Sequence, residues 1–154
     1  MSVKLPFLST HTGSVDDKGR LSVPAEYRNA LPPECERHIV LSLGNANFIN
    51  AFPIDFFNKI WESGESDETE FASLSNLERD TLLLGESVVR TIDGQGRITI
   101  PTTLLGKAGI ERDVVFMGRR THFTIWDAQS FEEHKQGLKL TAGDAWQRLI
   151  DRKR

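Results

Sequence analysis

The sequence predicts an α+β protein, mostly β, in which two tandem ββαββ units pack as an intrachain pseudo-dimer barrel with flanking helices. Three observations predict this class. A ten-residue motif occurs twice with a constant offset of 77 residues, as from Asp16 to Asp93. Residues of alternating polarity precede each copy, which is typical of strands. A proline, Pro24 or Pro101, follows each copy, where a helix can begin.

The repeated motif comprises residues 15–24 and 92–101, in which Asp, Gly, Arg and Pro recur at the same offsets. Four further positions exchange similar side chains, so chance similarity is a poor explanation. The Asp and Gly of each copy predict a sharp turn, since glycine adopts positive φ without steric cost. The structural residues of the motif are Asp16, Gly19, Asp93 and Gly96.

Each unit is expected to contain two strands, a short helix and a β-hairpin. The expected strands are 7–15 and 21–23 in the first unit and 87–92 and 98–100 in the second. The expected helices are 25–31 and 102–107, and the expected hairpins are 39–43 with 47–52 and 114–117 with 122–126. A unit of about 45 residues buries only a marginal core. We therefore expect the two halves to interlock around a pseudo-two-fold axis.

Further helices are expected over 53–62, over 71–84 with Gly85 as the stop, and from Asp127, a candidate N-cap, onward. Residues 63–69 are expected to form a mobile acidic loop, and residues 151–154 a frayed end. These elements predict a first domain at 7–54, a helical and acidic connector at 55–82, a second domain at 83–126 and a C-terminal helical tail at 127–154.

Two apolar groups are expected to be buried. The first has the spacing of a core or a subunit interface rather than of base-stacking platforms: Phe48, Phe52, Phe56, Phe57, Ile60 and Trp61. The second is expected to form the buried face of a helix: Leu74, Leu77, Thr81, Leu82 and Leu84.

Net charge is −3, which argues against a general nucleic-acid coat protein. The charge is uneven, because residues 1–80 sum to −6 and residues 81–154 to +3. Whole-chain charge therefore neither favours nor excludes DNA as a partner. There is no apolar run of the roughly 18–20 residues that cross a bilayer. The single cysteine, Cys35, excludes an internal disulfide, so a cytoplasmic protein is expected.

The motif residues resemble a known family. An Asp-x-x-x-Arg element that opens a ββαββ unit is similar to the AbrB/SpoVT swapped-hairpin superfamily of DNA-binding domains, and two tandem copies resemble the MraZ family. Residues 15–28 carry the likeness, together with 82–85, 93–101, 108–110 and 123–126. One difference between the copies is that Lys18 of the first is Gln95 in the second.

The resemblance implies a sequence-specific, DNA-binding transcriptional regulator, a repressor of its own operon, which in the family is the division and cell-wall gene cluster. It implies repeated promoter elements in double-stranded DNA as the partner. It also implies a ring-shaped homo-oligomer associated with the nucleoid. No cofactor, metal or small-molecule substrate is expected.

The predicted DNA-binding residues are Lys18, Arg20, Arg28 and Arg97. Arginine suits phosphate and guanine through its planar fork, and lysine gives phosphate a point charge. For Arg97 an intramolecular ion pair with Asp93 is an equal alternative, whereas for Arg20 the DNA role is favoured. A face with only three or four cations binds DNA weakly. We therefore expect a ring of subunits to engage several repeats at once and to gain affinity by multivalency.

Two other functions are alternatives to DNA binding: an enzyme and a protein-binding module. Asp16 and Asp93 could meet at the pseudo-two-fold axis as an acid dyad, but neighbouring cations would keep both carboxylates ionised. The four histidines have no metal-ligand spacing, and neither a nucleophile elbow nor a phosphate loop is present. The stronger alternative is an antitoxin-like, protein-binding module of the same superfamily. That role usually needs one N-terminal module and a disordered arm, whereas this chain has two modules.

Overall fold

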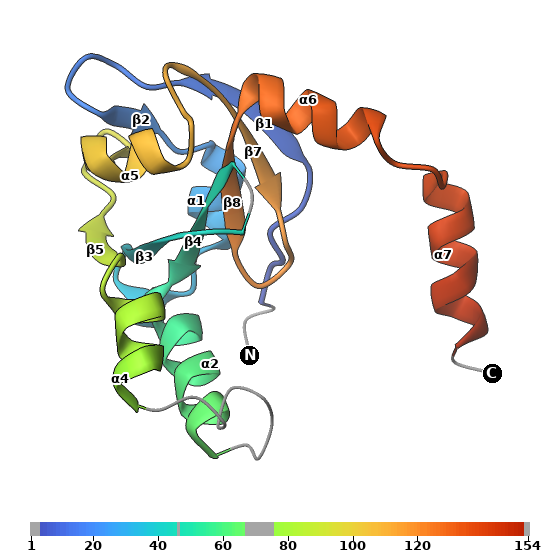
Figure 1. Cartoon of the computed structure of the whole chain (residues 1–154), viewed down its shortest axis with the longest axis horizontal. Helices are drawn as coiled ribbons and strands as arrows, with labels where there is room; N and C mark the ends of the chain where they lie inside the picture. The colour runs from blue at the N-terminus through green and yellow to red at the C-terminus, as the bar shows by residue number, and fades with distance from the viewer. Residues whose placement is uncertain (1–3, 46, 67–75, 153–154) are drawn as a thin grey trace.

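The computed structural model describes residues 4–45, 47–66 and 76–152. Within them the protein is α+β and mostly β, as predicted, with one six-stranded and one two-stranded antiparallel sheet (Figure 1). In spatial order the larger sheet contains β1 (Thr10–Ser14), β7 (Asp113–Gly118), β8 (Phe123–Asp127), β4 (Phe48–Pro53), β3 (His38–Leu43) and β5 (Val88–Thr91). The smaller sheet contains β2 (Arg20–Ser22) and β6 (Arg97–Thr99).

Helices join and flank the sheets. They are α1 (Ala25–Ala30), the 3₁₀ turn η1 (Pro33–Cys35), α2 (Ile54–Ser66), α4 (Asn76–Arg79) continuing as the π-helix η2 (Asp80–Leu84), α5 (Thr102–Lys107), α6 (Ala128–Gln136) and α7 (Ala142–Asp151). The helix predicted at 102–107 is confirmed at both ends. The predicted N-cap is also confirmed, because the Asp127 carboxylate accepts a hydrogen bond from the Ser130 N–H at 3.0 Å.

Every strand of one half pairs with a strand of the other half. β1 pairs with β7, and the corresponding strands β5 and β3 pair in the same way. β2 pairs with its counterpart β6, and β4 with β8. Loop hydrogen bonds repeat this relation: Ile100 N–H donates to Gly19 O at 2.8 Å, and Val23 N–H donates to Gly96 O at 2.9 Å. Each half therefore supplies the partners that the other half lacks.

The main hydrophobic core contains residues of both halves. Leu21 and Ile98, paired across the small sheet, are both almost fully buried. Tyr27 of α1 is fully buried against Phe116 and Phe123 of the second half, with ring centroids 6.1 and 4.9 Å away. Because large apolar side chains of both units share this core, neither unit can bury its apolar face by itself.

The predicted barrel is not closed among the described residues. β1 and β5 are the edges of an open sheet, and β2 and β6 form a separate ribbon. The reason lies in the turns, because the chain reverses at residues 16–19 and 93–96 and sends the next strand to its counterpart. The swapped-hairpin arrangement and the domain limits at 54, 82 and 126 stay predictions.

Several element limits differ from expectation. The strand expected at 7–15 begins only at Thr10, since Ser9 has φ of 70° and interrupts the extended chain. Helix α2 continues to Ser66, so residues 63–66, expected in a loop, are helical. Gly85 has φ of −61° and is not a left-handed cap. Residues 67–75, which include parts of an expected loop and an expected helix, lie outside the described residues.

The apolar helix face expected to be buried is exposed. Leu77 is 77% exposed and Leu82 65%, while Thr81 and Leu84 are also exposed. Leu74 lies outside the described residues. In the aromatic group only Phe48 is buried, and Ile60 is 40% exposed. The expected burial of the helix face is not found in a single copy because, within the described residues, no segment of the same chain covers it. For the aromatic group, expected in a core or a subunit interface, the described residues show partial burial, and the interface alternative stays a prediction.

Candidate nucleic-acid interface

The two repeated turns hold their arginines in the same way. The Asp16 carboxylate accepts hydrogen bonds from the N–H groups of Lys18 and Arg20, both at 2.9 Å, and from Arg20 Nε at 2.7 Å. Asp93 accepts from the N–H groups of Gln95 at 2.8 Å and Arg97 at 3.0 Å, and from Arg97 Nε at 3.4 Å. Each aspartate thus closes its own turn and orients its own arginine.

Both aspartates are held in the ionised form. Hydrogen bonds from the backbone N–H of Arg20, and then its guanidinium, lower the pKa of Asp16 below its usual 3.8. The backbone N–H of Arg97 is likewise the main cause that lowers the pKa of Asp93. An acid dyad needs one carboxyl with a raised pKa so that it can hold a proton. These carboxyls have the opposite shift and an arginine each.

Each turn requires its glycine. Gly19 and Gly96 have φ of 79° and 80°, in the left-handed region that favours glycine. A side chain at Gly19 would place Cβ 2.7 Å from the carbonyl oxygen of Ile100. Close backbone approach between the halves therefore fixes where the two turns lie.

The outer face of the β2–β6 ribbon presents both arginines. Leu21 and Ile98 face each other and point into the core. Side chains alternate along a strand, so the neighbouring residues point outward. These outward residues are Arg20, Ser22, Arg97 and Thr99. Ser22 and Thr99 are exposed, and the arginine side chains are about one-third exposed, at 34% and 31%.

The Nη groups of Arg20 and Arg97 remain available to bind a ligand. Within the described part of the chain, only Nε of Arg20 and of Arg97 takes part in side-chain hydrogen bonds, each time to its aspartate. The Nη groups, which carry the other four N–H donors of each guanidinium, make no hydrogen bond within the described residues. The arrangement pre-orients two forks on one ribbon and can bind oxyanions or the acceptor edge of a guanine.

Lys18 and Arg28 are placed differently. Lys18 is exposed at the tip of the first turn. Arg28, expected to extend the basic face near Lys18, instead lies against the second turn, where its guanidinium atoms are 3.0–3.1 Å from the position of a Cβ on Gly96. Its Nε donates to Val23 O at 3.1 Å. It is therefore grouped with Arg97 rather than with Lys18.

Sequence reasoning missed a second pair of arginines, Arg37 and Arg112. The carbonyl of Arg112 accepts the Val15 N–H at 2.9 Å, and the carbonyl of Arg37 accepts the corresponding Ile92 N–H at 3.1 Å. Both side chains are exposed beside the repeated turns. Arg37 also lines a hollow of about 430 Å³ together with Arg28. The offset between these two is 75 residues rather than 77, which concealed them from the repeat.

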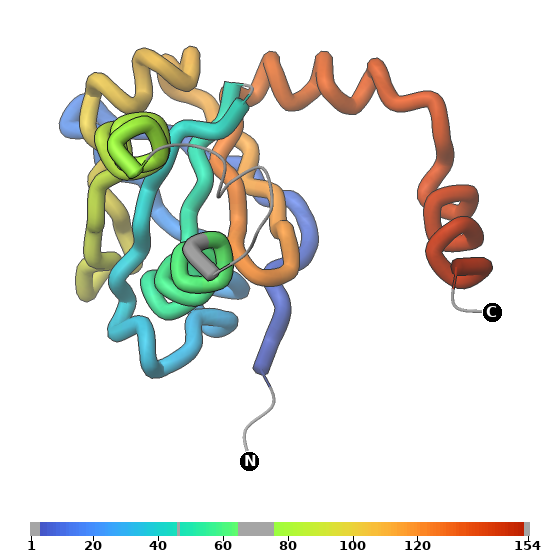
Figure 2. The backbone as a smooth tube through the Cα atoms, turned by 60° about the horizontal axis from the view of Figure 1, so that its bottom comes forward, coloured from blue at the N-terminus to red at the C-terminus, as the bar shows by residue number. Residues whose placement is uncertain are grey.

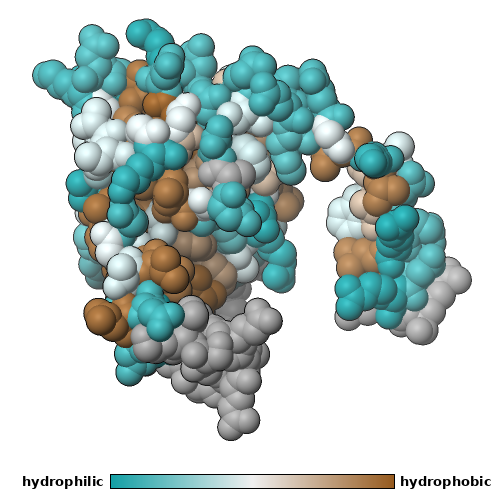
Figure 3. Space-filling model, viewed as in Figure 1, coloured by the Kyte–Doolittle hydropathy of each residue, from teal (hydrophilic) through white to brown (hydrophobic). Residues whose placement is uncertain are grey.

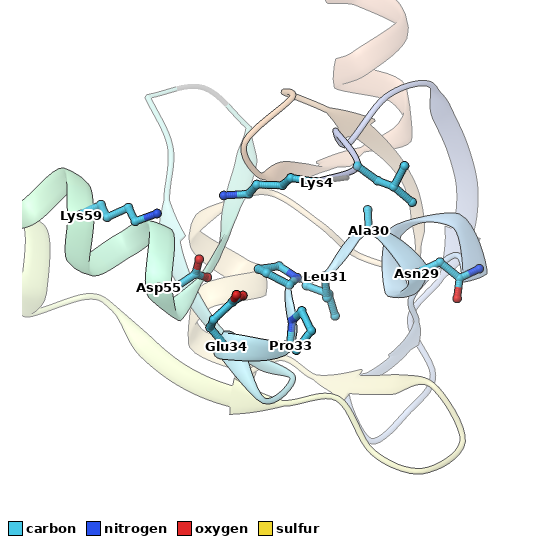
Figure 4. Close-up of a pocket in the computed structure, with 10 residues that line it drawn as sticks. Lys4, Asn29, Ala30, Leu31, Pro33, Glu34, Asp55 and Lys59 are labelled. Carbon is cyan, nitrogen blue, oxygen red and sulfur yellow. The ribbon is translucent and has the colours of Figure 1, made fainter. Parts of the chain in front are cut away.

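Another hollow, of about 540 Å³, contains none of the predicted DNA-binding residues (Figure 4). Lys59 and Asp55 project from α2, Glu34 from η1, and Lys4 from the N-terminal segment. Two cations and two carboxylates give it no net charge. It has neither the positive sign nor the repeated geometry of the ribbon.

The remaining reactive groups are isolated. Burial raises the pKa of the Cys35 thiol, which keeps it protonated. Burial next to Phe52 and Phe56, with the charge of Arg119, lowers the pKa of His122 to about 4, so its ring is neutral near pH 7. Within residues 4–45, 47–66 and 76–152, no cluster of three or more metal-binding side chains occurs. Over the same ranges, none of the helices combines the length and apolar character needed to span a bilayer.

The sequence of this chain is similar to those of known proteins. A protein of Rickettsia akari named "Transcriptional regulator MraZ" is 36% identical over 138 residues, which cover 88% of this chain and 91% of the relative. The chain belongs to the MraZ family. A Frankia alni protein of the same name is 36% identical over 128 residues, covering 83% of this chain and 85% of the relative. A Methylococcus capsulatus protein of that name is 32% identical over 130 residues, with 84% of each chain covered.

The family described as "MraZ protein, putative antitoxin-like" matches residues 83–153. This match includes the second repeat with Asp93 and Arg97, and it continues through α6 and α7. The first repeat is covered by the full-length relatives. Membership of the MraZ family, inferred from the repeated motif, is therefore confirmed over most of the chain.

Proposed function

We propose that this MraZ-family chain is a DNA-binding transcription regulator and that the outer face of the β2–β6 ribbon contacts duplex DNA. One observation carries the proposal: Arg20 and Arg97 stand on one face of a two-stranded antiparallel ribbon, each held by an aspartate through Nε. The major groove of B-DNA is wide enough for such a ribbon. The relatives' name, transcriptional regulator, agrees with a DNA partner.

The two arginines are assigned to reading and anchoring. Their free Nη donors suit the O6 and N7 acceptors of guanine or the oxygens of a phosphate. Ser22 and Thr99, exposed on the same face, can donate to phosphate or base edges. Because the arginines are fixed before binding, less side-chain entropy is lost when DNA binds.

The flanking cations are assigned to phosphate contacts. Lys18 extends from the first turn, and Arg28 stands beside Arg97 at the second. Arg37 and Arg112 widen the positive face on either side. Each phosphate contact steepens the dependence of binding on salt by about one unit in log–log slope. The second repeat, with Gln95 in place of lysine, contributes fewer such contacts.

A single face of this size binds weakly, so the function also needs repetition. We propose a ring-shaped homo-oligomer that displays the face several times and engages repeated promoter elements upstream of its own operon as a repressor. The proposed organisation is two tandem swapped-hairpin domains, 7–54 and 83–126, joined by the connector at 55–82, in a nucleoid-associated cytoplasmic protein. Joining several weak contacts can raise affinity by about 100-fold or more.

Fluorescence anisotropy with duplexes from the region upstream of its own gene tests the proposal. The variants Arg20→Ala and Arg97→Ala should each weaken binding about tenfold, since a lost bidentate base contact costs roughly 1–3 kcal/mol. Lys59→Ala removes an exposed cation on α2, away from the ribbon, and is the matched control. Equal affinity of wild type and the double arginine variant would refute the ribbon as the interface. Equal affinity for one and for several repeats would refute the multivalent mode.

A further inference from the structure

Helix α7 is amphipathic, and none of its residues is buried by the described part of its own chain. Its apolar residues recur at helical spacing: Ala142, Ala145, Trp146, Leu149 and Ile150. All are exposed, and Trp146 is 64% exposed. A capping box between Thr141 and Asp144 begins the helix. An ordered helix of ten residues with an uncovered apolar stripe is marginal in water, so it needs a surface to cover the stripe.

An apolar groove lies elsewhere among the described residues of the same chain. A hollow of about 210 Å³ is bounded by Ile54 and Phe57 of α2, Leu84 of η2, and Val89 of β5. The same helical segment, α4 and η2, also exposes leucines at positions 77, 82 and 83. Figure 3 shows hydrophobic residues gathered on this side of the body and again on α7. A hollow of about 210 Å³ has room for one aromatic side chain.

The helix and the groove of one chain lie on opposite sides of the molecule. In both views α7 stands clear of the body on the side away from α4 (Figures 1 and 2). The connection between α6 and α7 comprises only residues 137–141 and reaches about 17 Å when fully extended. A helix tethered in this way meets the groove of another copy more readily than its own.

The charges of the two regions are opposite. Residues 137–154 contain five basic and two acidic side chains, for a net charge of +3. Residues 60–86 contain one basic and eight acidic side chains, for a net charge of −7. Arg148 of α7, Arg152 at its C-cap and Asp80 of η2 are among them. Opposite net charges attract residues 137–154 of one copy to residues 60–86 of another. Like charges repel two copies of the same region.

We propose that α7 of one copy docks into the groove between α2, η2 and β5 of the next copy, with Trp146 in the hollow lined by Leu84 and Val89. The contact is head-to-tail, because helix and groove are different surfaces, and repetition of such a contact closes into a ring when the rotation between copies allows. The inference rests on the homo-oligomer of the proposed function and names the surfaces that build it.

A mixing experiment tests the head-to-tail arrangement. Trp146→Glu removes the helix side and Val89→Glu the groove side. Each variant alone should change from the wild-type assembly to a monomer in light scattering coupled to size exclusion. An equimolar mixture should give a heterodimer and nothing larger, since only one intact helix and one intact groove remain. A mixture that stays monomeric, or variants that keep the wild-type mass, would overturn the proposal.

Controls separate assembly from folding and from DNA binding. Gln147→Ala alters the polar side of α7 and should keep the wild-type mass. Since α7 has no buried residue within one chain, Trp146→Glu should unfold in urea with the same midpoint as wild type diluted until it is monomeric. Leu84→Glu, on η2, is a second groove variant that should reproduce Val89→Glu. The monomeric variants should still bind a single-repeat duplex as weakly as one subunit does. Loss of that binding would count against the ribbon interface, not against the helix contact.

Discussion

The two repeated turns share a backbone but differ in what packs on them. At the second turn the Arg28 guanidinium lies on Gly96. The position related to Arg28 by the repeat is Leu105, and beside Gly19 it lines an open hollow of about 300 Å³. The aspartate–arginine contact is 2.7 Å at the first turn and 3.4 Å at the second. Duplication preserved the scaffold and left the contacting side chains free to diverge, so the two halves of the proposed interface are not equivalent.

The largest expected difference concerns the glycines. Gly19→Ala should lower the free energy of unfolding by about 3 kcal/mol. Two costs add: alanine must adopt a left-handed backbone conformation, and its Cβ clashes with the backbone carbonyl oxygen of Ile100. Gly96→Ala should cost about 1–2 kcal/mol, because it meets a flexible arginine side chain instead. Urea unfolding followed by circular dichroism measures both. A larger loss for Gly96→Ala would reverse the comparison.

The next effect comes from the side chain that distinguishes the turns. Arg28→Leu places at the second turn the residue type found at the first. It should lower the unfolding free energy by about 1–2 kcal/mol, since it removes the hydrogen bond to Val23 O and the packing on Gly96. Arg37→Leu, on the same hollow but exposed, is the matched control and should stay within about 0.5 kcal/mol. An unfolding curve of Arg28→Leu that superimposes on wild type would show that Arg28 does not brace the turn.

A smaller exchange concerns Lys18 and Gln95. Lys18→Gln makes the first turn resemble the second and should reduce the slope of log affinity against log salt by about one. Gln95→Lys makes the reverse change and should increase the slope by about one. DNA titrations from low to moderate salt measure both slopes. If neither variant alters the slope, the turn tips do not reach phosphate.

The smallest expected difference between the turns concerns the stability of the fold at acid pH. Asp16 and Asp93 have lower pKa values in the folded protein than the usual 3.8, so both stabilise the fold above that pH. This stabilisation is lost as the pH falls through their folded pKa values. Asp16→Asn should flatten the acid limb of the stability curve more than Asp93→Asn, because its arginine contact is shorter. Thermal unfolding between pH 5 and about 2 would show whether the two variants differ.

Much of the local structure could be predicted from short patterns. The turns, the short ribbon strands, helix α5 and the Asp127 cap depend on glycine, proline and aspartate at fixed positions, whose preferences act within a few residues. The arginines of the ribbon were found for the same reason, since they recur with the motif. Arg37 and Arg112 were not, because only the fold carries them to the turns.

The sequence by itself determined the duplication, the turn chemistry and the family, because these depend on local sequence or on similarity along the chain. It also predicted Arg20 and Arg97 as the residues of the proposed DNA contact. The tertiary structure alone decided that each strand pairs with the other half, that the sheet is open within the described residues, that Arg28 lies against Gly96, and that Leu77 and Leu82 are exposed. Apolar spacing says that a face must be buried but not against what. For α7 and the groove that answer lies, as proposed, in a second copy of the chain.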